Sequence, residues 1–245
     1  MSDRIRQISP QTYARVAGLL YLVNIVTGLI GEAVVRNGLV VSGDAAATAA
    51  NIAHSTALWR GGIAGDLIMH VTDVPLMMIF YVLFRQVHKN LALTAMLFEL
   101  VQTASLVAYK LNMMTPLFLS SGAEYLKAFT PDQLHALAYI AIKADSHGFG
   151  FGLIFFGCAC LINGYLIYKS NFLPRILGPA LQLAGICYLI NSFALILAPP
   201  LADALFPAIL LPSFAGELSF CLWLLVKGID VSKWEATEAV WRASN

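Results

Sequence analysis

Long apolar stretches with few charges alternate with short polar connections along most of the chain. A helix that crosses a bilayer needs about 20 predominantly apolar residues, and continuous apolar runs are typical of helices rather than of barrel strands. Six stretches meet this requirement: 13–35, 61–84, 91–119, 147–168, 176–198 and 208–227. The pattern therefore predicts an all-α membrane protein, in which residues 1–245 form a single integral domain, a six-transmembrane-helix bundle.

Two of the connections carry helical patterns of their own. In the first connection, an Ala-rich stretch follows Asp44. In the third, the sequence TPDQ from Thr130 supplies an N-cap, a proline at the first helical position and a glutamine at the third. Apolar residues then recur at helical spacing, so we expect amphipathic helices at the membrane interface in both connections. In the tail 228–245, Trp234 and Trp241 are seven apart, which fits either a helix with one apolar face or a frayed polar segment.

Composition strengthens the membrane interpretation. Apolar residues make up 59% of the chain and charged residues 12%, with a mean hydropathy of +0.74, outside the range of soluble domains. The net charge of +1 leaves no concentrated basic face for phosphates, so we expect a lipid bilayer and no nucleic acid as partner. The four cysteines lie inside apolar runs without a CxxC pair, as packing residues do.

Lys and Arg are distributed unevenly between the two sides of the predicted bundle. Ten, including Arg4 and Arg6, fall on the side of the termini, and five fall on the opposite side. Cytoplasmic loops of membrane proteins carry the excess of Lys and Arg. The distribution therefore predicts that both termini are cytoplasmic.

Three carboxylates, Asp73, Glu99 and Glu217, lie near the middle of the second, third and sixth predicted spans. A charge at the centre of a membrane helix costs about 2.5–3.5 kcal/mol on insertion scales, so such residues mark a buried polar site. At about 1.5 Å per residue, the three carboxylates reach a similar depth. Asp66 and His70 share a helix face with Asp73, which extends the site toward the outer surface.

A divalent metal site is an alternative use of these groups. His147 begins the fourth span, preceded by Asp145, and both lie on the same side as His70. Their spacing is compatible with metal ligation, but a lone membrane histidine is more often a hydrogen-bonded packing residue. Lys110, near the outer end of the third span, is expected to extend to the surface.

Glycines recur in the second and fourth spans, including HGFGFG at 147–152 and Gly157. No P-loop lysine follows them and no strand pattern precedes them, so a phosphate-binding loop is excluded. Close packing of helices through small residues is the expected role.

Five segments, SPQTYARVAGLLYL, GDAAATAANI, NFLPRILGPAL, CYLINSF and GELSFCLWLLVKGI, resemble the bacterial membrane family catalogued as domain of unknown function 4386. The resemblance extends from about residue 9 to residue 230. It implies a bacterial multi-pass protein of the inner membrane. Because the role of the family is unassigned, the resemblance transfers no catalytic residue.

Three functions compete for the buried groups. Proton- or cation-coupled transport of an ion or small molecule would use a chain of carboxylates and histidine, and without a clear internal repeat alternating access would use a homo-oligomer. A membrane-embedded hydrolase would hold a divalent metal between His70, His147 and a carboxylate. In a structural, sensor or accessory subunit the polar groups would only join helices, although such contacts average only about 0.6 kcal/mol. Transport is the leading hypothesis.

Overall fold

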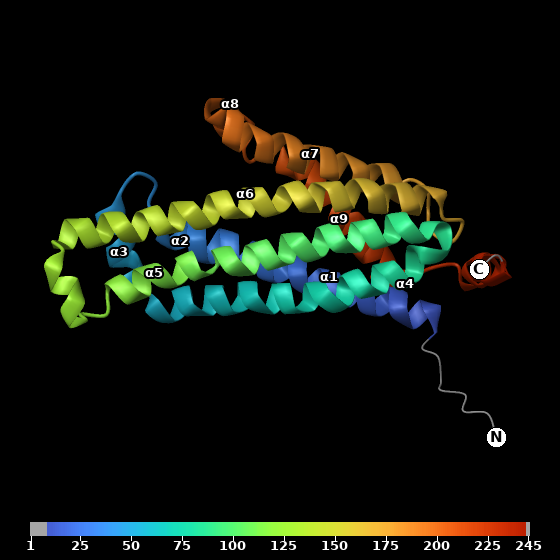
Figure 1. Ribbon diagram of the computed structural model, residues 1–245, viewed down its shortest axis with the longest axis horizontal. Coiled ribbons are helices and arrows are strands. Elements are labelled where there is room, and N and C mark those ends of the chain that lie inside the picture. Colours follow the sequence, from blue (N-terminus) through green and yellow to red (C-terminus); the bar gives the residue numbers. More distant parts are fainter. Residues whose placement is uncertain (1–8, 244–245) are drawn as a thin grey trace, which may run out of the picture.

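The computed structural model describes residues 9–243, which form helices and no strands (Figure 1). The elements in chain order are α1 (Pro10–Ile30), the π-helical turn η1 (Gly31–Arg36), α2 (Asn37–Leu39), α3 (Ala45–His54), α4 (Thr56–Tyr109), α5 (Leu111–Leu119), the 3-10 helix η2 (Glu124–Ala128), α6 (Pro131–Lys169), α7 (Leu177–Leu197), α8 (Pro199–Leu205), α9 (Leu210–Val226) and α10 (Val231–Ala243). The predicted cytoplasmic charges Arg4 and Arg6, and residues 244–245 of the tail, lie outside the described residues.

The long element α4 folds back on itself. Its backbone leaves the helical region at His88 (φ −161°, ψ 99°), and Figure 1 shows the chain reversing direction within α4. Contacts pair residues placed symmetrically about this point: Asp66 lies 3.2 Å from Lys110, and Thr103 donates to Asp73 at 3.2 Å. The first and second legs of α4, before and after His88, therefore form an antiparallel helical hairpin.

Several helices have the length and composition of membrane spans. Among the described residues, four stretches pass this test: Pro10–Leu39, Thr56–Leu119, Pro131–Lys169 and Leu177–Leu197. The pair α8 and α9, bent by 56°, passes it together and raises the number to five. The predicted all-helical fold class and the apolar, membrane-type character of the helices are confirmed.

The third connection differs from the prediction of a separate interfacial helix. Thr130 forms the expected capping box with Gln133, but the helix that begins there continues unbroken as α6. No glycine or proline interrupts the sequence before the HGFGFG segment, and the charge of Asp145 is compensated by Lys110 at 3.0 Å. The prediction of a separate helix is therefore wrong, and the predicted fourth span, 147–168, is the second half of the longer helix α6.

The first connection and the tail are helical as expected. Asp44 caps α3 with its side chain. In the tail, α10 buries Trp234, whose indole N–H donates to the carbonyl of Leu83 at 3.3 Å. The guanidinium of Arg85 lies 5.3 Å from the ring centroid of Trp241. The helical alternative for the tail is thus confirmed, and α10 is attached to the turn end of the α4 hairpin.

Two apolar clusters occupy different ends of the bundle. The larger cluster includes Phe80, Phe84 and Phe220, and the rings of Phe80 and Phe220 lie 5.5 Å apart. The smaller cluster surrounds Trp59 and Met113. On the first leg of α4, the ionisable residues lie between these two clusters, so apolar packing encloses them from both ends.

Glycine pairs bring α6 and α7 into close contact. A Cβ atom added to Gly164 would lie 2.6 Å from the carbonyl oxygen of Gly178, and one added to Gly185 would lie 2.6 Å from that of Gly157. The two pairs are seven residues apart on each helix, which is one repeat of a helix interface. The close packing predicted for such glycines is confirmed at Gly157.

Substituting one of these glycines should weaken the bundle. We expect Gly164→Ala to destabilise the protein by about 1–3 kcal/mol, the usual cost of overpacking, because the new methyl group meets backbone atoms. Gly61→Ala is the matched control, since no atom beyond its chain neighbours and the adjoining backbone of its own helix lies within 4 Å of its added Cβ. The measurement is the thermal unfolding midpoint in mild detergent. Equal midpoints for the two variants would contradict the close contact.

Candidate functional site

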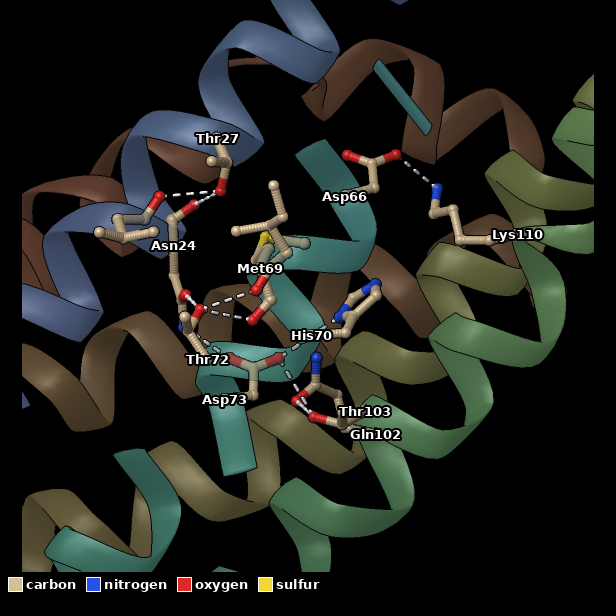
Figure 2. Close-up of polar contacts among 12 residues, drawn as sticks. Asn24, Thr27, Asp66, Met69, His70, Thr72, Asp73, Gln102, Thr103 and Lys110 are labelled. Atoms are coloured by element: carbon tan, nitrogen blue, oxygen red, sulfur yellow. Dashed lines mark hydrogen bonds and ion pairs between the residues drawn. The ribbon is translucent and has the colours of Figure 1, made fainter. Parts of the chain in front are cut away.

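The first leg of α4 presents Asp66, His70 and Asp73 on one face (Figure 2). Their spacing of four and then three residues places them on successive turns of the same side. Asp66 is 1% exposed and His70 2% exposed, whereas the side chain of Asp73 is 19% exposed. The predicted stripe of ionisable groups is therefore inside the bundle and opens most at Asp73.

Asp73 is held by neutral donors from three helical segments. Asn24 of α1 donates its amide to one carboxylate oxygen at 2.6 Å. The hydroxyl of Thr103, on the second leg, donates to the other oxygen at 3.2 Å. His70 Nδ1 lies 3.4 Å from that same oxygen, and Asn24 in turn accepts a hydrogen bond from Thr72. No Lys or Arg side chain pairs with Asp73 in the described part of the chain.

His70 lies between the two aspartates of its helix face. Figure 2 shows its ring between the Asp66–Lys110 pair and the carboxylate of Asp73. Its Nε2 atom is buried and has no hydrogen-bond partner among the described residues. A histidine ring can carry a hydrogen on either nitrogen, so one ring nitrogen faces Asp73 while the other is left open.

Asp66 is held in a buried ion-pair network. It lies 2.8 Å from Arg36 and 3.2 Å from Lys110, and Lys110 also lies 3.0 Å from Asp145. Arg36 binds Glu32 at 2.6 Å. The expectation that Lys110 extends to the surface is wrong, since it is 6% exposed. Asp66 and Asp145 compensate the charge of Lys110 there. The reversal in α4 brings Lys110 to Asp66, and α6 supplies Asp145.

A π-helical turn and a glycine shape the approach of Arg36 to this network. The turn η1 ends at Arg36, and π-helical segments are frequently found at functional sites. A Cβ added to Gly31 would lie 2.8 Å from a carboxylate oxygen of Asp66. Glycine at this position therefore leaves room for the Asp66 carboxylate where it pairs with Arg36. Arg36 is a site residue that the sequence pattern did not predict; the one signal for it is a cation at the end of an apolar run.

Glu99 and Glu217 are buried with neutral partners of their own. Glu99 accepts a hydrogen bond from Asn163 of α6 at 2.8 Å. Glu217 of α9 accepts one from Tyr21 at 2.9 Å and another from Tyr188. Both are 8% exposed. Their hydrogen-bond partners, which the sequence analysis did not identify, differ from those of the aspartate stripe.

Each glutamate lies about one helical turn from a contact of Asp73: Glu99 precedes Thr103 by four residues, and Tyr21, which binds Glu217, precedes Asn24 by three residues. The three carboxylates therefore occupy one region of the bundle interior, although they come from three different helical segments. No Lys or Arg pairs with either glutamate among the described residues. The region contains acids that only neutral groups and His70 contact.

The structure does not bring the proposed metal ligands together. His147 Nδ1 lies 2.9 Å from the carbonyl oxygen of Lys143 in its own helix, and Asp145 is engaged by Lys110. Among residues 9–243, no group of three or more His, Cys, Asp and Glu side chains is arranged to hold a metal ion. The set of His70, Asp145 and His147 is thus not assembled as a donor cluster.

The helices and the buried acids together define an apolar, all-helical protein of membrane type. The chain belongs to the family described as Domain of unknown function (DUF4386), which matches residues 16–228. It is also similar to an uncharacterized protein of Archaeoglobus fulgidus, with 25% identity over 173 residues, 70% of this chain and 86% of that protein. No solved structure matches the chain. The family membership predicted from the five segments is confirmed.

Removing one partner of the ion-pair network should be costly. We expect Lys110→Met to destabilise the protein by about 3–5 kcal/mol, because Asp145 then loses its cation inside the bundle. The double variant Lys110→Met with Asp145→Leu should recover most of this loss, since Asp66 keeps Arg36. The measurement is unfolding by SDS in mixed micelles. A double variant no more stable than the single one would contradict the pairing.

Proposed function

We propose that the protein is a multi-pass protein of the bacterial inner membrane that moves protons, or exchanges cations for protons, through the site around His70 and Asp73. One observation carries this proposal. A buried histidine with an unpartnered ring nitrogen lies next to a carboxylate that only neutral donors hold. Chains of carboxylates and histidine are the usual route of protons through helical bundles.

The two aspartates of the stripe are suited to different tasks. Asp66 faces two cations, so protonating it would leave both cations with less compensation. Asp73 can gain or lose a proton without breaking an ion pair to Lys or Arg, and its side chain is the more exposed of the two. We therefore assign Asp73, with His70, as the proton-carrying pair, and Asp66 as a fixed anchor.

Glu99 and Glu217 supply further acids for the same task. Each is buried without a cationic partner among the described residues, and each lies in the same region of the bundle as Asp73. Chains of acids in the interior of a helical bundle can pass a proton from one to the next. The common location of these carboxylates supports proton transfer among several acids rather than at a single one.

We propose six crossings of the membrane with both termini in the cytoplasm. The reversal at His88 divides α4 into two legs, each the length of a span, and the bent pair α8 and α9 supplies another. Together with α1, α6 and α7, these give six. The excess of Lys and Arg on the side of the termini supports the orientation.

Cysteine labelling tests this topology. In a cysteine-free background, Lys89→Cys places a thiol at the α4 turn, and Ser121→Cys places one in the exposed connection after α5. We expect a membrane-impermeant maleimide to label Ser121→Cys in intact cells and Lys89→Cys only after permeabilisation. Labelling of both from the outside would contradict two crossings by α4, and the reverse pattern would invert the orientation.

A structural or accessory role is the second candidate. The network of Arg36, Asp66, Lys110 and Asp145 joins four segments and leaves the charges of its aspartates compensated, as a structural clamp would. This role needs no proton movement. Flux measurements separate it from transport, because it predicts that exchange of Asp73 changes only stability.

The flux experiment uses the purified chain in liposomes that enclose a pH-sensitive dye. A potassium diffusion potential, and then gradients of Na⁺ or K⁺, provide the driving force. We expect proton flux above that of protein-free vesicles, reduced by Asp73→Asn to the protein-free rate. Asp203→Asn, which changes an exposed aspartate of α8, is the matched control and should keep the flux.

Two results would contradict transport at this site. One is proton flux in Asp73→Asn equal to that of the wild type. The other is wild-type flux no higher than that of protein-free vesicles under every gradient. Size-exclusion profiles and helical content of all variants show whether any loss comes from misfolding.

A further inference from the structure

A cleft of about 920 Å³ opens at the turn end of the bundle, apart from the carboxylate site. It is lined by Gln86 of α4, by Ser170 and Arg175 of the α6–α7 connection, and by Lys233 and Trp241 of α10. In Figure 1, α10 lies at the end of the molecule where α4 reverses. The volume of the cleft is within the range of small-molecule sites.

The side-chain amide of Gln86, which lines this cleft, lacks hydrogen-bond partners among the described residues. The residue is 7% exposed, and neither its amide nitrogen nor its carbonyl oxygen has a partner among the described residues. A buried polar group without a partner is costly, and native proteins satisfy nearly all such groups. A group that enters the cleft and accepts the amide hydrogens would remove the part of this cost that comes from the nitrogen.

The charged side chains of the cleft favour an anion. Arg175 and Lys233 line it, and no Asp or Glu is among its lining residues. The ammonium of Lys233 also lies 2.9 Å from the carboxylate of Asp230, which is not a lining residue. Arg85 adds positive charge beside the cleft, over the ring of Trp241. Arg, Lys and amide donors together are the groups that proteins use to bind phosphate oxygens.

We propose that this cleft binds a phosphate-bearing anion, held by the amide of Gln86 and by the side chains of Arg175 and Lys233. This chemistry is shared by the headgroup of an anionic lipid and by a soluble phosphate ester. Basic pockets at the cytoplasmic ends of membrane helices bind such headgroups. Leu173 and Val240 give the cleft apolar walls as well. The inference concerns a site that is separate from proton movement and does not rest on it.

The test measures binding to the full-length chain in detergent by native mass spectrometry and by the shift of the thermal unfolding midpoint. The probes are phosphatidylglycerol, phosphatidylcholine and glycerol 3-phosphate. We expect saturable binding of at least one phosphate anion and no comparable shift with phosphatidylcholine. Arg175→Gln and Lys233→Gln should each weaken the apparent affinity about fivefold.

A second variant addresses the amide directly. Gln86→Leu should raise the midpoint without a probe, because it removes a buried amide that lacks partners. It should also shrink the shift that the anion produces. Arg60→Gln, which removes an exposed cation near the opposite end of the first leg, is the control and should bind as the wild type does.

The outcomes separate the two sources of phosphate. Binding of phosphatidylglycerol without glycerol 3-phosphate identifies a lipid headgroup, and the converse identifies a soluble ester; either supports the site. The proposal is overturned if neither anion binds saturably, if phosphatidylcholine acts as phosphatidylglycerol does, or if Arg60→Gln weakens binding as much as Arg175→Gln. Midpoints without a probe show whether each variant is folded.

Discussion

Burying Asp66, His70 and Asp73 within one apolar helix is the constraint on which the arrangement of the bundle depends. Such a helix is marginal alone, because each central charge costs about 2.5–3.5 kcal/mol on insertion scales. The surrounding segments each supply a partner: Asn24 from α1, Arg36 from η1, and Thr103 and Lys110 from the far side of the α4 turn. Rotating or sliding the first leg would leave these buried polar groups without their partners. The polar face therefore fixes the position of the first leg relative to the neighbouring helices.

The stripe divides into a half held by Lys and Arg and a half held by other groups. Asp66 and Asp73 are seven residues apart, or roughly 10 Å along the helix. At Asp66, two cations and a second carboxylate make a closed ion-pair network. At Asp73, the donors are an amide, a hydroxyl and a histidine ring. The partners of the two aspartates thus distinguish a carboxylate fixed by cations from one without a Lys or Arg partner among the described residues, and only the second suits the proposed movement of protons.

Three features could be predicted from the sequence, because they depend on local pattern: the helical class, the caps at Asp44 and Thr130, and the placement of ionisable residues on one helix face. The sequence could not supply the partner of Lys110, because that pairing requires the chain reversal at His88 and the neighbouring position of α6. Likewise, spacing made His147 look like a ligand, whereas its ring turns back to its own helix. A helical pattern gives the face of a residue and not its neighbour.

The carboxylate site and the proposed anion cleft both include residues of the first leg of α4. Asp73 and Gln86 are thirteen residues apart, which is roughly 20 Å along a helix. Phe80 and Phe84, in the larger apolar cluster, fill the space between them. A ligand at Gln86 therefore cannot contact Asp73, and any influence must be mechanical. An anion at Gln86 would influence Asp73 only to the extent that it favours one position of the first leg over another.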